Sequence, residues 1–354
     1  MENLPLGKVP WPLLSKIVHK TGFKDNKGIV QTAEEGVDVA VLNLADIISN
    51  VKKTYNTNSI PYLIYKSDPI TFPTPNPAKY LIIVNKNDLA TAGALPFGIT
   101  STIVLPPNSK SQYLLNLQSQ LSEVCNDHKI TILGGHTEVS ENVKFPILSA
   151  SMIGFVPPEY YIPRNPEEGD LIICSGWVGA EGTGILLVEG KEYFYDILGQ
   201  EEYNLGAKIG EDIDISERII NCNKEWHNSL NLVHDATEGG ILGAIYECLP
   251  PKGFGCEVYS SDIPIADVTK KISEELQINP FMLISSGAVL VICKRENAKY
   301  VMECLYRENK PAAIIGKILR RGNSVKMDGK PIGPPEADHL IKGLEQLKVL
   351  TKGN

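Results

Sequence analysis

The chain has 354 residues, enough for two domains of ordinary size, and its 43% hydrophobic and 21% charged residues are typical of a globular protein. The formal net charge of -8 argues against the clustered Lys and Arg of a nucleic-acid-binding protein, so a phosphate ligand would need a local site. No apolar run approaches the roughly 18 residues of a membrane helix, and the first residues lack a secretory signal. We therefore expect a cytoplasmic protein that binds neither nucleic acid nor membrane.

The first half of the chain alternates short apolar runs with small-residue or amphipathic segments. Leu114, Leu117, Leu121 and Val124 recur at helical spacing. We expect strands at residues 80–84, 99–105, 130–135 and 145–156, and helices at residues 87–94 and 111–129.

A proline-rich and charged segment, PPEYYIPRNPEEGD at residues 157–170, disfavours both helix and central strand. We interpret it as a linker between two domains. The predicted domains are residues 1–156 and residues 166–345.

After the linker the same alternation returns. The strand at 171–176 leads into the glycine-rich turn GWVGAEGTG, and the tail has the pattern of an amphipathic helix. Further strands are expected at 231–235, 287–294 and 311–318, and helices at 241–249, 296–309 and 339–354. The predicted fold class is α/β (α+β), with two domains that each have a sheet covered by helices.

The seven cysteines are scattered, without any C-x-x-C pair. An odd count without zinc-site spacing indicates reduced thiols, not a disulfide framework or a metal site. We expect no catalytic cysteine.

Acidic residues recur where apolar runs meet turns. Asp38 precedes such a run, Asp68 and the pair Asn87-Asp88 follow one each, and Asp235 follows the strand NLVHD. His136 and Glu138 come directly after a Gly-Gly turn. Each residue alone is typical of a helix cap or a structural contact. Their recurrence favours a shared Mg²⁺ site, because Mg²⁺ binds through one or two carboxylates together with substrate phosphates.

The stretch HDATEGG adds a second feature, a glycine-rich turn between a strand and a helix. Thr237 is a candidate N-cap, while Gly239 and Gly240 would let the backbone approach a ligand closely. The free N–H groups of the helix could then bind phosphate. His234 could orient Asp235 or act as an acid–base group, with a structural hydrogen bond as the alternative.

In this order, HDATEGGILGAIYE, NDLATAGALP, EGVDVAVL and GGHTEV resemble the aminoimidazole ribonucleotide (AIR) synthase-related superfamily. This group includes PurM-type cyclo-ligases, HypE-type hydrogenase maturation proteins, selenophosphate synthetases and thiamine-monophosphate kinases. HDATEGGILGAIYE is most similar to the HypE-type signature. The resemblance extends from the N-terminal segment to SSGAVLVI and covers most of the chain.

The resemblance implies a PurM-like subunit of two domains, and a homodimer whose N-terminal sheets form a shared barrel. It also implies that ATP and Mg²⁺ are the cofactors and that the γ-phosphate is transferred to a small-molecule or protein acceptor. The carboxylates carried over for metal and phosphate are Asp38, Asp68, Asp88 and Asp235. The residues carried over or inferred for the nucleotide site are Asn87, Lys66, Lys86, Thr237, Gly239 and Gly240. The catalytic candidates are Asp88, Asp235 and His234.

Three departures from the family pattern stand out. Val37 takes the place of one acidic residue, His136 takes the place of an aspartate that Glu138 could replace, and the tail LTKGN lacks the terminal cysteine of HypE-type proteins. The last cysteine is Cys304.

The leading hypothesis is an ATP- and Mg²⁺-dependent phosphotransfer or ligase-type enzyme that acts on a carbonyl, amide or phosphate oxygen. Activities like thiamine-monophosphate kinase or AIR synthase stay open within it. The alternative is a nucleotide-binding partner or sensor without turnover. A third reading takes the acidic residues as helix caps only.

Overall fold

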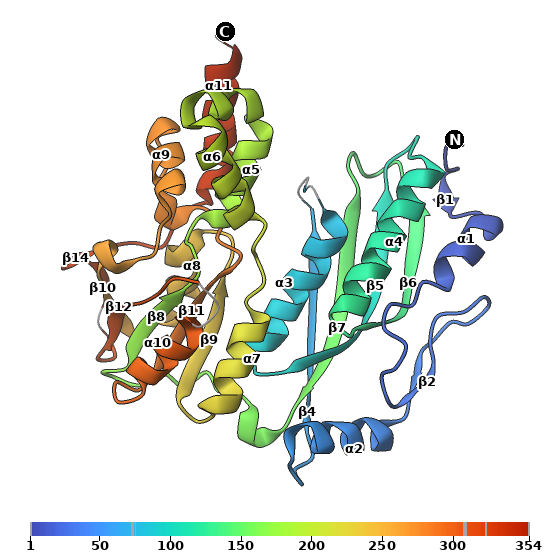
Figure 1. Ribbon diagram of the computed structural model, residues 1–354, viewed down its shortest axis with the longest axis horizontal. Helices are drawn as coiled ribbons and strands as arrows, with labels where there is room; N and C mark the ends of the chain where they lie inside the picture. The colour runs from blue at the N-terminus through green and yellow to red at the C-terminus, as the bar shows by residue number, and fades with distance from the viewer. Residues whose placement is uncertain (1, 72–73, 75, 307–309, 323, 353–354) are drawn as a thin grey trace. The chain divides into compact units, whose positions relative to one another are not determined.

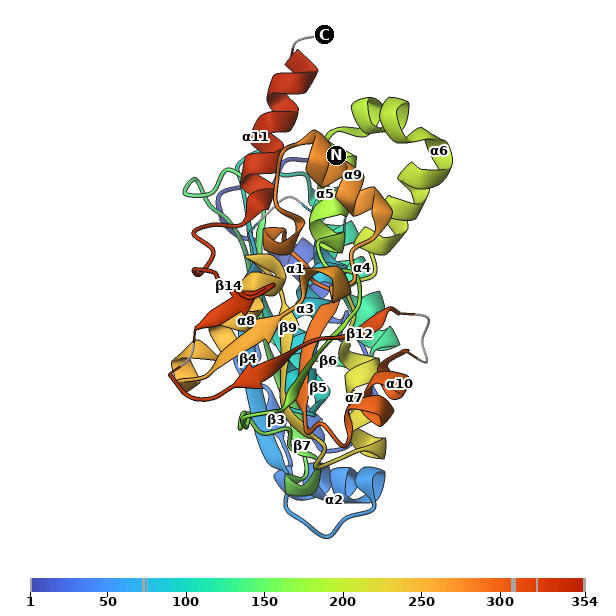
Figure 2. The same ribbon diagram turned by 90° about the vertical axis from the view of Figure 1, so that its left-hand side faces the viewer.

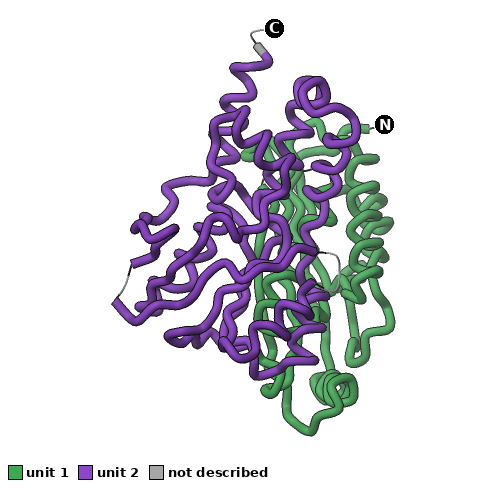
Figure 3. Tube along the Cα trace, turned by 60° about the vertical axis from the view of Figure 1, so that its left-hand side comes forward, with its two compact units in different colours: residues 1–161 green, residues 162–354 purple. Residues whose placement is uncertain are grey.

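The computed structural model describes residues 2–71, 74, 76–306, 310–322 and 324–352 (Figure 1). The chain divides into two compact units, residues 1–161 and residues 162–354, each with its own sheet and core (Figure 3). The division falls within the proline-rich segment, just after the short helix η1 (Pro158–Tyr160).

A five-stranded sheet in the order β1-β6-β5-β7-β4 forms the base of the first unit. Its strands are β1 (Gly7–Lys8), β4 (Tyr62–Ile70), β5 (Leu95–Leu105), β6 (Thr131–Val139) and β7 (Ile147–Val156). Only β5 and β6 run parallel; the other neighbours are antiparallel. β4 lies at the edge of the sheet and pairs only with β7 among the described strands. An edge strand tolerates a proline such as Pro69, because one of its two sides has no partner strand that needs an N–H donor.

Two helices, α3 (Pro77–Thr91) and α4 (Ser111–Asp127), lie side by side on one face of this sheet (Figure 1). Leu81 and Leu121 are fully buried in the core between the helices and the strands. The remaining elements are α1 (Trp11–Val18), α2 (Leu44–Tyr55) and the small ribbon of β2 (Ile29–Gln31) and β3 (Val41–Leu42).

The expected strand at residues 80–84 is wrong, because these residues lie inside α3. The Asn76 side chain accepts a hydrogen bond from the Lys79 N–H, and Pro77 occupies the first helical position, so both start signals of a helix are present. Residues 81–83 are all buried, which gives the run no helical periodicity. The expected strand 99–105 and helix 111–129 are confirmed as β5 and α4.

The second unit has a seven-stranded sheet in the order β14-β13-β10-β12-β8-β11-β9. Its strands are β8 (Leu171–Ser175), β9 (Leu230–Ala236), β10 (Gly255–Val258), β11 (Ala288–Cys293), β12 (Ala312–Leu319), β13 (Val325–Met327) and β14 (Lys330–Pro331). β8 pairs antiparallel with both β11 and β12, and all six residues of β11 are buried. β9 is an edge strand, and it carries the HDA of the glycine-turn motif.

Seven α-helices of the described residues accompany this sheet. They are α5 (Ala180–Glu189), α6 (Lys191–Gly210), α7 (Ser216–Glu225), α8 (Gly240–Cys248), α9 (Asp267–Glu275), α10 (Ala298–Tyr306) and α11 (His339–Lys352), with short turns η2 (Pro250–Lys252), η3 (Ser260–Asp262) and η4 (Pro280–Met282). Figure 2 shows α6 bent into two pieces, and the bend lies at Gly199, whose φ is 73°. None of the helices in the described ranges combines the length and apolar character needed to cross a bilayer.

The mixed architecture confirms the α/β (α+β) fold class. All seven cysteines are buried thiols. Burial raises the pKa of Cys174 to about 12, so this thiol is protonated at neutral pH.

Candidate functional site

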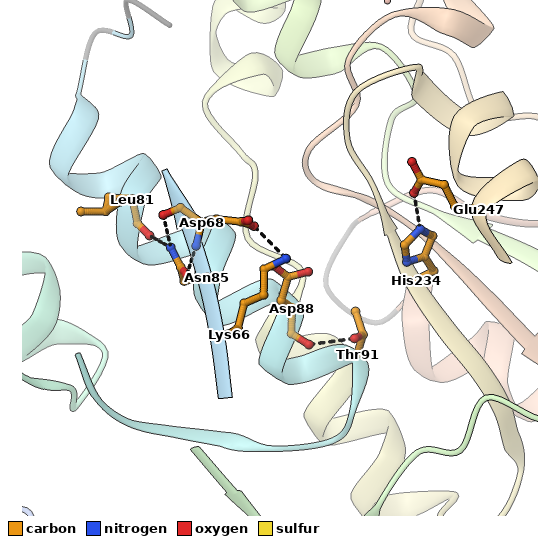
Figure 4. A network of polar contacts seen from close by, with 8 residues as sticks. All are labelled: Lys66, Asp68, Leu81, Asn85, Asp88, Thr91, His234 and Glu247. Atoms are coloured by element: carbon orange, nitrogen blue, oxygen red, sulfur yellow. Dashed lines mark hydrogen bonds and ion pairs between the residues drawn. The ribbon is translucent and has the colours of Figure 1, made fainter. Parts of the chain in front are cut away.

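In the first unit, Lys66 joins two of the predicted carboxylates (Figure 4). Its Nζ atom lies 3.1 Å from Asp68 Oδ2 and 3.0 Å from Asp88 Oδ2. Lys66 and Asp68 come from the same face of β4, and Asp88 comes from the last turn of α3. The two carboxylates therefore both contact the ammonium group of Lys66. Such a pair of carboxylates could also bind a metal cation that replaces this ammonium group.

The three side chains are only partly screened by solvent, with exposed fractions of 35%, 36% and 22% for Lys66, Asp68 and Asp88. Burial acts to lower the pKa of Lys66, but the adjacent Asp88 and Asp68 outweigh it and the net pKa is raised. The ammonium group stays charged at neutral pH.

Asn85, which the sequence patterns did not single out, fixes the backbone of Asp68. The Asp68 N–H donates to Asn85 Oδ1 at 3.0 Å, and Asn85 Nδ2 donates to Asp68 O at 3.3 Å and to Leu81 O at 2.9 Å (Figure 4). Asn85 is fully buried. It ties the edge strand to α3 and so sets the separation of the two carboxylates. No local pattern in the sequence singles out this amide.

The neighbouring predicted residues Lys86 and Asn87 are buried in α3. The Nζ atom of Lys86 lies 2.7 Å from Nδ1 of His128 at the end of α4. The expectation that Asn87 and Asp88 directly follow a strand is wrong, because both are helical. Thus the structure brings Lys66 to the carboxylate pair, while Lys86 contacts His128.

Asp38 lies in a separate place within the first unit. It lines a cavity of about 640 Å³ together with Trp11, Gly135 and His136. This wall belongs to β6, which is separated from β4 by β5 and β7. Within the described part of the first unit, no three His, Cys, Asp or Glu side chains are grouped closely enough to hold a metal ion. Asp68 and Asp88 therefore meet without Asp38.

The loop that carries Asp38 is tied to α1. Ser15 Oγ donates to Glu35 Oε1 at 2.6 Å, and His19 Nε2 lies 3.2 Å from the same oxygen. The hydrogen bond from Ser15 is the main reason why the pKa of Glu35 is lowered.

His136 and Glu138 do not follow a turn, because β6 continues through both of them to Val139. Residues two apart on a strand face the same side. Accordingly, His136 Nε2 lies 3.3 Å from Glu138 Oε2. Both side chains are substantially exposed, and His136 lines the cavity.

In the second unit, His234 and Asp235 lie on β9, directly before the glycine turn. His234 Nε2 is 2.8 Å from Glu247 Oε2 of α8 (Figure 4). Asp235 is buried, with 6% of its surface exposed. The histidine is therefore bound to a carboxylate of the following helix.

The expected N-cap role of Thr237 is wrong. The N-cap of α8 is Gly239, with φ of 75° and no side-chain cap of its own. The acceptor for the Gly239 N–H is Asp338 Oδ2 at 2.7 Å, supplied from just before α11. Thr237 contributes its backbone carbonyl, which accepts hydrogen bonds from the N–H groups of Gly240 and Ser285.

A buried carboxyl lies close to this turn. Glu181, only 5% exposed, accepts a hydrogen bond from the Ser286 N–H at 3.2 Å. Burial raises its pKa to about 7, and the charges of Asp338 and Glu238 act in the same direction. Burial also raises the pKa of Asp338. Neither Glu181 nor Asp338 belonged to the predicted site, because both residues lie far in sequence from the HDATEGG motif.

Known proteins resemble this chain in both sequence and structure. The AIR synthase related family matches twice, its N-terminal domain over residues 65–156 and its C-terminal domain over residues 167–328. A hydrogenase expression/formation protein of Methanocaldococcus jannaschii is 28% identical over 279 residues, which cover 75% of this chain and 80% of that protein. The carbamoyl dehydratase HypE of Escherichia coli is 23% identical over 293 residues, covering 81% and 82%.

Solved structures show the same fold. The crystal structure of E. coli HypE superposes with a TM-score of 0.75 at 21% identity, covering 94% of this chain and 99% of that chain. The hydrogenase maturation protein HypE in complex with ATP superposes with a TM-score of 0.63 at 17% identity, covering 79% and 87%.

Proposed function

Because the chain belongs to the AIR synthase-related family, we propose that it is an ATP- and Mg²⁺-dependent enzyme that phosphorylates a carbonyl, amide or phosphate oxygen of an acceptor molecule. The observation that carries this proposal is the convergence of Asp68 and Asp88 on one cation. A relative with this fold was crystallised with ATP, and relatives by sequence are named as hydrogenase expression proteins and carbamoyl dehydratases.

Asp68 and Asp88 fit Mg²⁺, because proteins commonly bind this ion through one or two carboxylates when substrate phosphates supply further ligands. When bound, Mg²⁺ would neutralise the negative charge on the phosphate oxygens of ATP. Lys66, beside both carboxylates, would donate a hydrogen bond to a phosphate oxygen. Asp38 and Asp235 remain candidate ligands, and Asn87, Lys86, Thr237, Gly239 and Gly240 remain candidates for the nucleotide site.

His234 remains a candidate acid–base group. Its contact with Glu247 would orient the imidazole. An imidazole held in this way could exchange a proton with the acceptor or with a leaving oxygen.

The acceptor group is proposed to come from another molecule. Every cysteine of the chain is buried, Cys304 included. No thiol is therefore presented to the solvent as a substrate of the chain's own reaction. A small-molecule or protein oxygen acceptor accords with this burial.

A homodimer through the first unit is part of the proposal. Leu63 and Tyr65 lie on the face of β4 opposite to the core residue Ile64, with 58% and 65% of their surfaces exposed. Tyr62, on the core-side face near the start of the strand, is also half exposed. Exposed large apolar side chains on a sheet face are typical of a surface that a second copy covers.

The test is to measure ADP release from ATP and Mg²⁺ by the purified protein, with and without pools of cell metabolites, beside the variant Asp88→Asn. We expect acceptor-dependent ADP release that the variant loses. Mg²⁺-dependent ATP binding without ADP under any condition would favour the sensor. A protein that is not stabilised by ATP and Mg²⁺ at saturating concentrations would refute both.

A further inference from the structure

Lys66 occupies the position that a metal ion would need. Its ammonium contacts Oδ2 of Asp68 and Oδ2 of Asp88, each at about 3 Å. The two oxygens can consequently be no more than roughly 6 Å apart. Mg²⁺ binds oxygens at about 2.0–2.1 Å, so an ion held by these two carboxylates would compete with the ammonium group for the same oxygens.

The lysine is the mobile member of this group. Its charge is carried by a flexible stem of four carbons, and about a third of the side chain is exposed. The backbone of Asp68, in contrast, is held on both sides by the buried Asn85, and Asp88 is fixed within α3. Exchange of one cation for another thus requires movement of Lys66 more than of the strand or the helix.

We propose that Lys66 is a displaceable counter-ion, which holds Asp68 and Asp88 together in the metal-free protein and turns to a nucleotide phosphate when Mg²⁺ takes its place. This inference rests on the proposed function and assigns Lys66 a role in the order of binding. In the metal-free state the ammonium offsets the repulsion between two carboxylates held near each other.

The charges explain why the lysine is useful in both states. Two carboxylates and one ammonium have a net charge of -1, and Mg²⁺ changes the net charge to +1. Without Lys66, the loaded site would be neutral. A positive site attracts the polyanionic triphosphate, whereas the same positive charge opposes Mg²⁺ that arrives alone. Lys66 therefore favours the Mg²⁺–nucleotide complex over the free metal ion.

If Lys66 has this role, its removal should change the affinity for the free metal ion and the affinity for the metal–nucleotide complex in opposite directions. Lys66→Met should bind Mn²⁺ alone about tenfold more tightly than the wild-type protein, because a competing charge next to a divalent ion is removed. The same variant should bind Mg²⁺ with a non-hydrolysable ATP analogue about tenfold more weakly, because one phosphate contact is lost. A lysine with only a structural role would not separate the two affinities.

The experiment uses the full chain and compares three variants with the wild-type protein. Lys66→Met removes the charge, Lys66→Arg keeps it, and Lys270→Met removes a lysine from an exposed ion pair with Asp267 in the second unit. Mn²⁺ binding is measured by electron paramagnetic resonance without nucleotide, and nucleotide binding by isothermal titration calorimetry. Lys66→Arg and Lys270→Met are expected to bind Mn²⁺ as the wild-type protein does.

The outcomes separate this inference from the proposed function. Unchanged or weaker Mn²⁺ binding by Lys66→Met overturns the counter-ion role, and tighter nucleotide binding by that variant overturns the contact with phosphate. If Lys270→Met also binds Mn²⁺ more tightly, the change would be a general effect of the protein's net charge. That result would also overturn the counter-ion role of Lys66. A wild-type protein without any affinity for Mg²⁺ and ATP overturns the proposed function, and the Mn²⁺ comparison still decides the role of Lys66.

Discussion

The N–H of Gly239 and the carboxylate of Asp338, 99 residues apart in sequence, are joined by a hydrogen bond of 2.7 Å. Asp338 also accepts a hydrogen bond from the Leu340 N–H at 2.7 Å. One side chain thus accepts hydrogen bonds from the N-cap residue of α8 and from the first turn of α11. The glycine turn of the HDATEGG motif depends on a residue that lies far from it along the chain.

Asp338→Ala should therefore lower the free energy of unfolding by about 2 kcal/mol, since it leaves two helix N-termini without their acceptor. Urea unfolding measures the loss. Asp267→Ala, which removes an aspartate from an exposed pair with Lys270, is the control and should change stability by less than about 0.5 kcal/mol. Equal losses in the two variants would contradict the capping role.

Glu181 makes the stability of the protein depend on pH. Its pKa in the folded state, about 7, lies above the ordinary value of 4.5. The folded state therefore favours the protonated form, and its stabilising contribution is complete below about pH 4.5 and is lost as the pH rises through 7.

Glu181→Gln should remove this dependence while its side-chain oxygen still accepts the Ser286 N–H. Relative to the wild-type protein, the variant should gain stability on the order of 3 kcal/mol between pH 5 and pH 8. Thermal or urea unfolding at both pH values measures the difference. Glu189→Gln, at an exposed position of the same helix, should show no such gain; a parallel pH profile for all three proteins would refute the explanation.

Gly240 is expected to tolerate no side chain. Its φ is +63°, and a Cβ atom would lie 2.6 Å from the Phe281 carbonyl oxygen and 2.8 Å from that of Leu283. Gly240→Ala should cost about 3 kcal/mol or more, from backbone strain and collision with two carbonyl groups. Gly253 has φ of +81° with open space around it, so Gly253→Ala should cost only about 1 kcal/mol. Unfolding midpoints that coincide would argue against the collision.

Asn85→Ala should weaken both the fold and the metal site. The variant removes a fully buried amide that makes three hydrogen bonds to the backbone of Asp68 and Leu81, at a cost of about 2–3 kcal/mol. It should also reduce Mn²⁺ affinity, because Asp68 loses its anchor. Asn116→Ala, at an exposed position of α4, is the control for both measurements. Unaltered Mn²⁺ affinity in a folded Asn85→Ala protein would exclude the positioning role.

The exposed face of β4 predicts the state of association. If a second copy covers this face, the double variant Leu63→Glu and Tyr65→Glu should sediment as a monomer where the wild-type protein sediments as a dimer, because four charges would be buried without partners. Val349→Glu, at another exposed apolar position, should leave the dimer intact. Circular dichroism checks that the double variant is folded. A wild-type monomer would refute the proposed dimer.

The sequence predicted elements such as β5 and α4, which have a β-branched run or a clear helical period. It gave no expectation for the amphipathic helices α2, α7 and α9 or for strand β4. It failed at residues 80–84, where a helix buried on most sides has no polar face and resembles a buried strand. It also ended β6 too early, so that His136 and Glu138 were placed after a turn, although both are strand residues.

Part of the candidate site could be predicted and part could not. Lys66, Asp68 and Asp88 were chosen from local spacing, and they meet because β4 and α3 pack against each other. Asn85 and Asp338 were not chosen, because their roles depend on tertiary contacts that local patterns do not contain. Asp38 lies at a different cavity from Asp68, a separation that spacing along the chain could not reveal.

The dependence of Gly239 on Asp338 also bears on synthesis at the ribosome. The strand, the glycine turn and α8 emerge first, but their capping carboxylate is translated only 99 residues later. Until that stretch leaves the exit tunnel, the helix start must be hydrated or occupied by another acceptor. The HDATEGG motif is consequently expected to become rigid late, after nearly all of the nascent second unit is available.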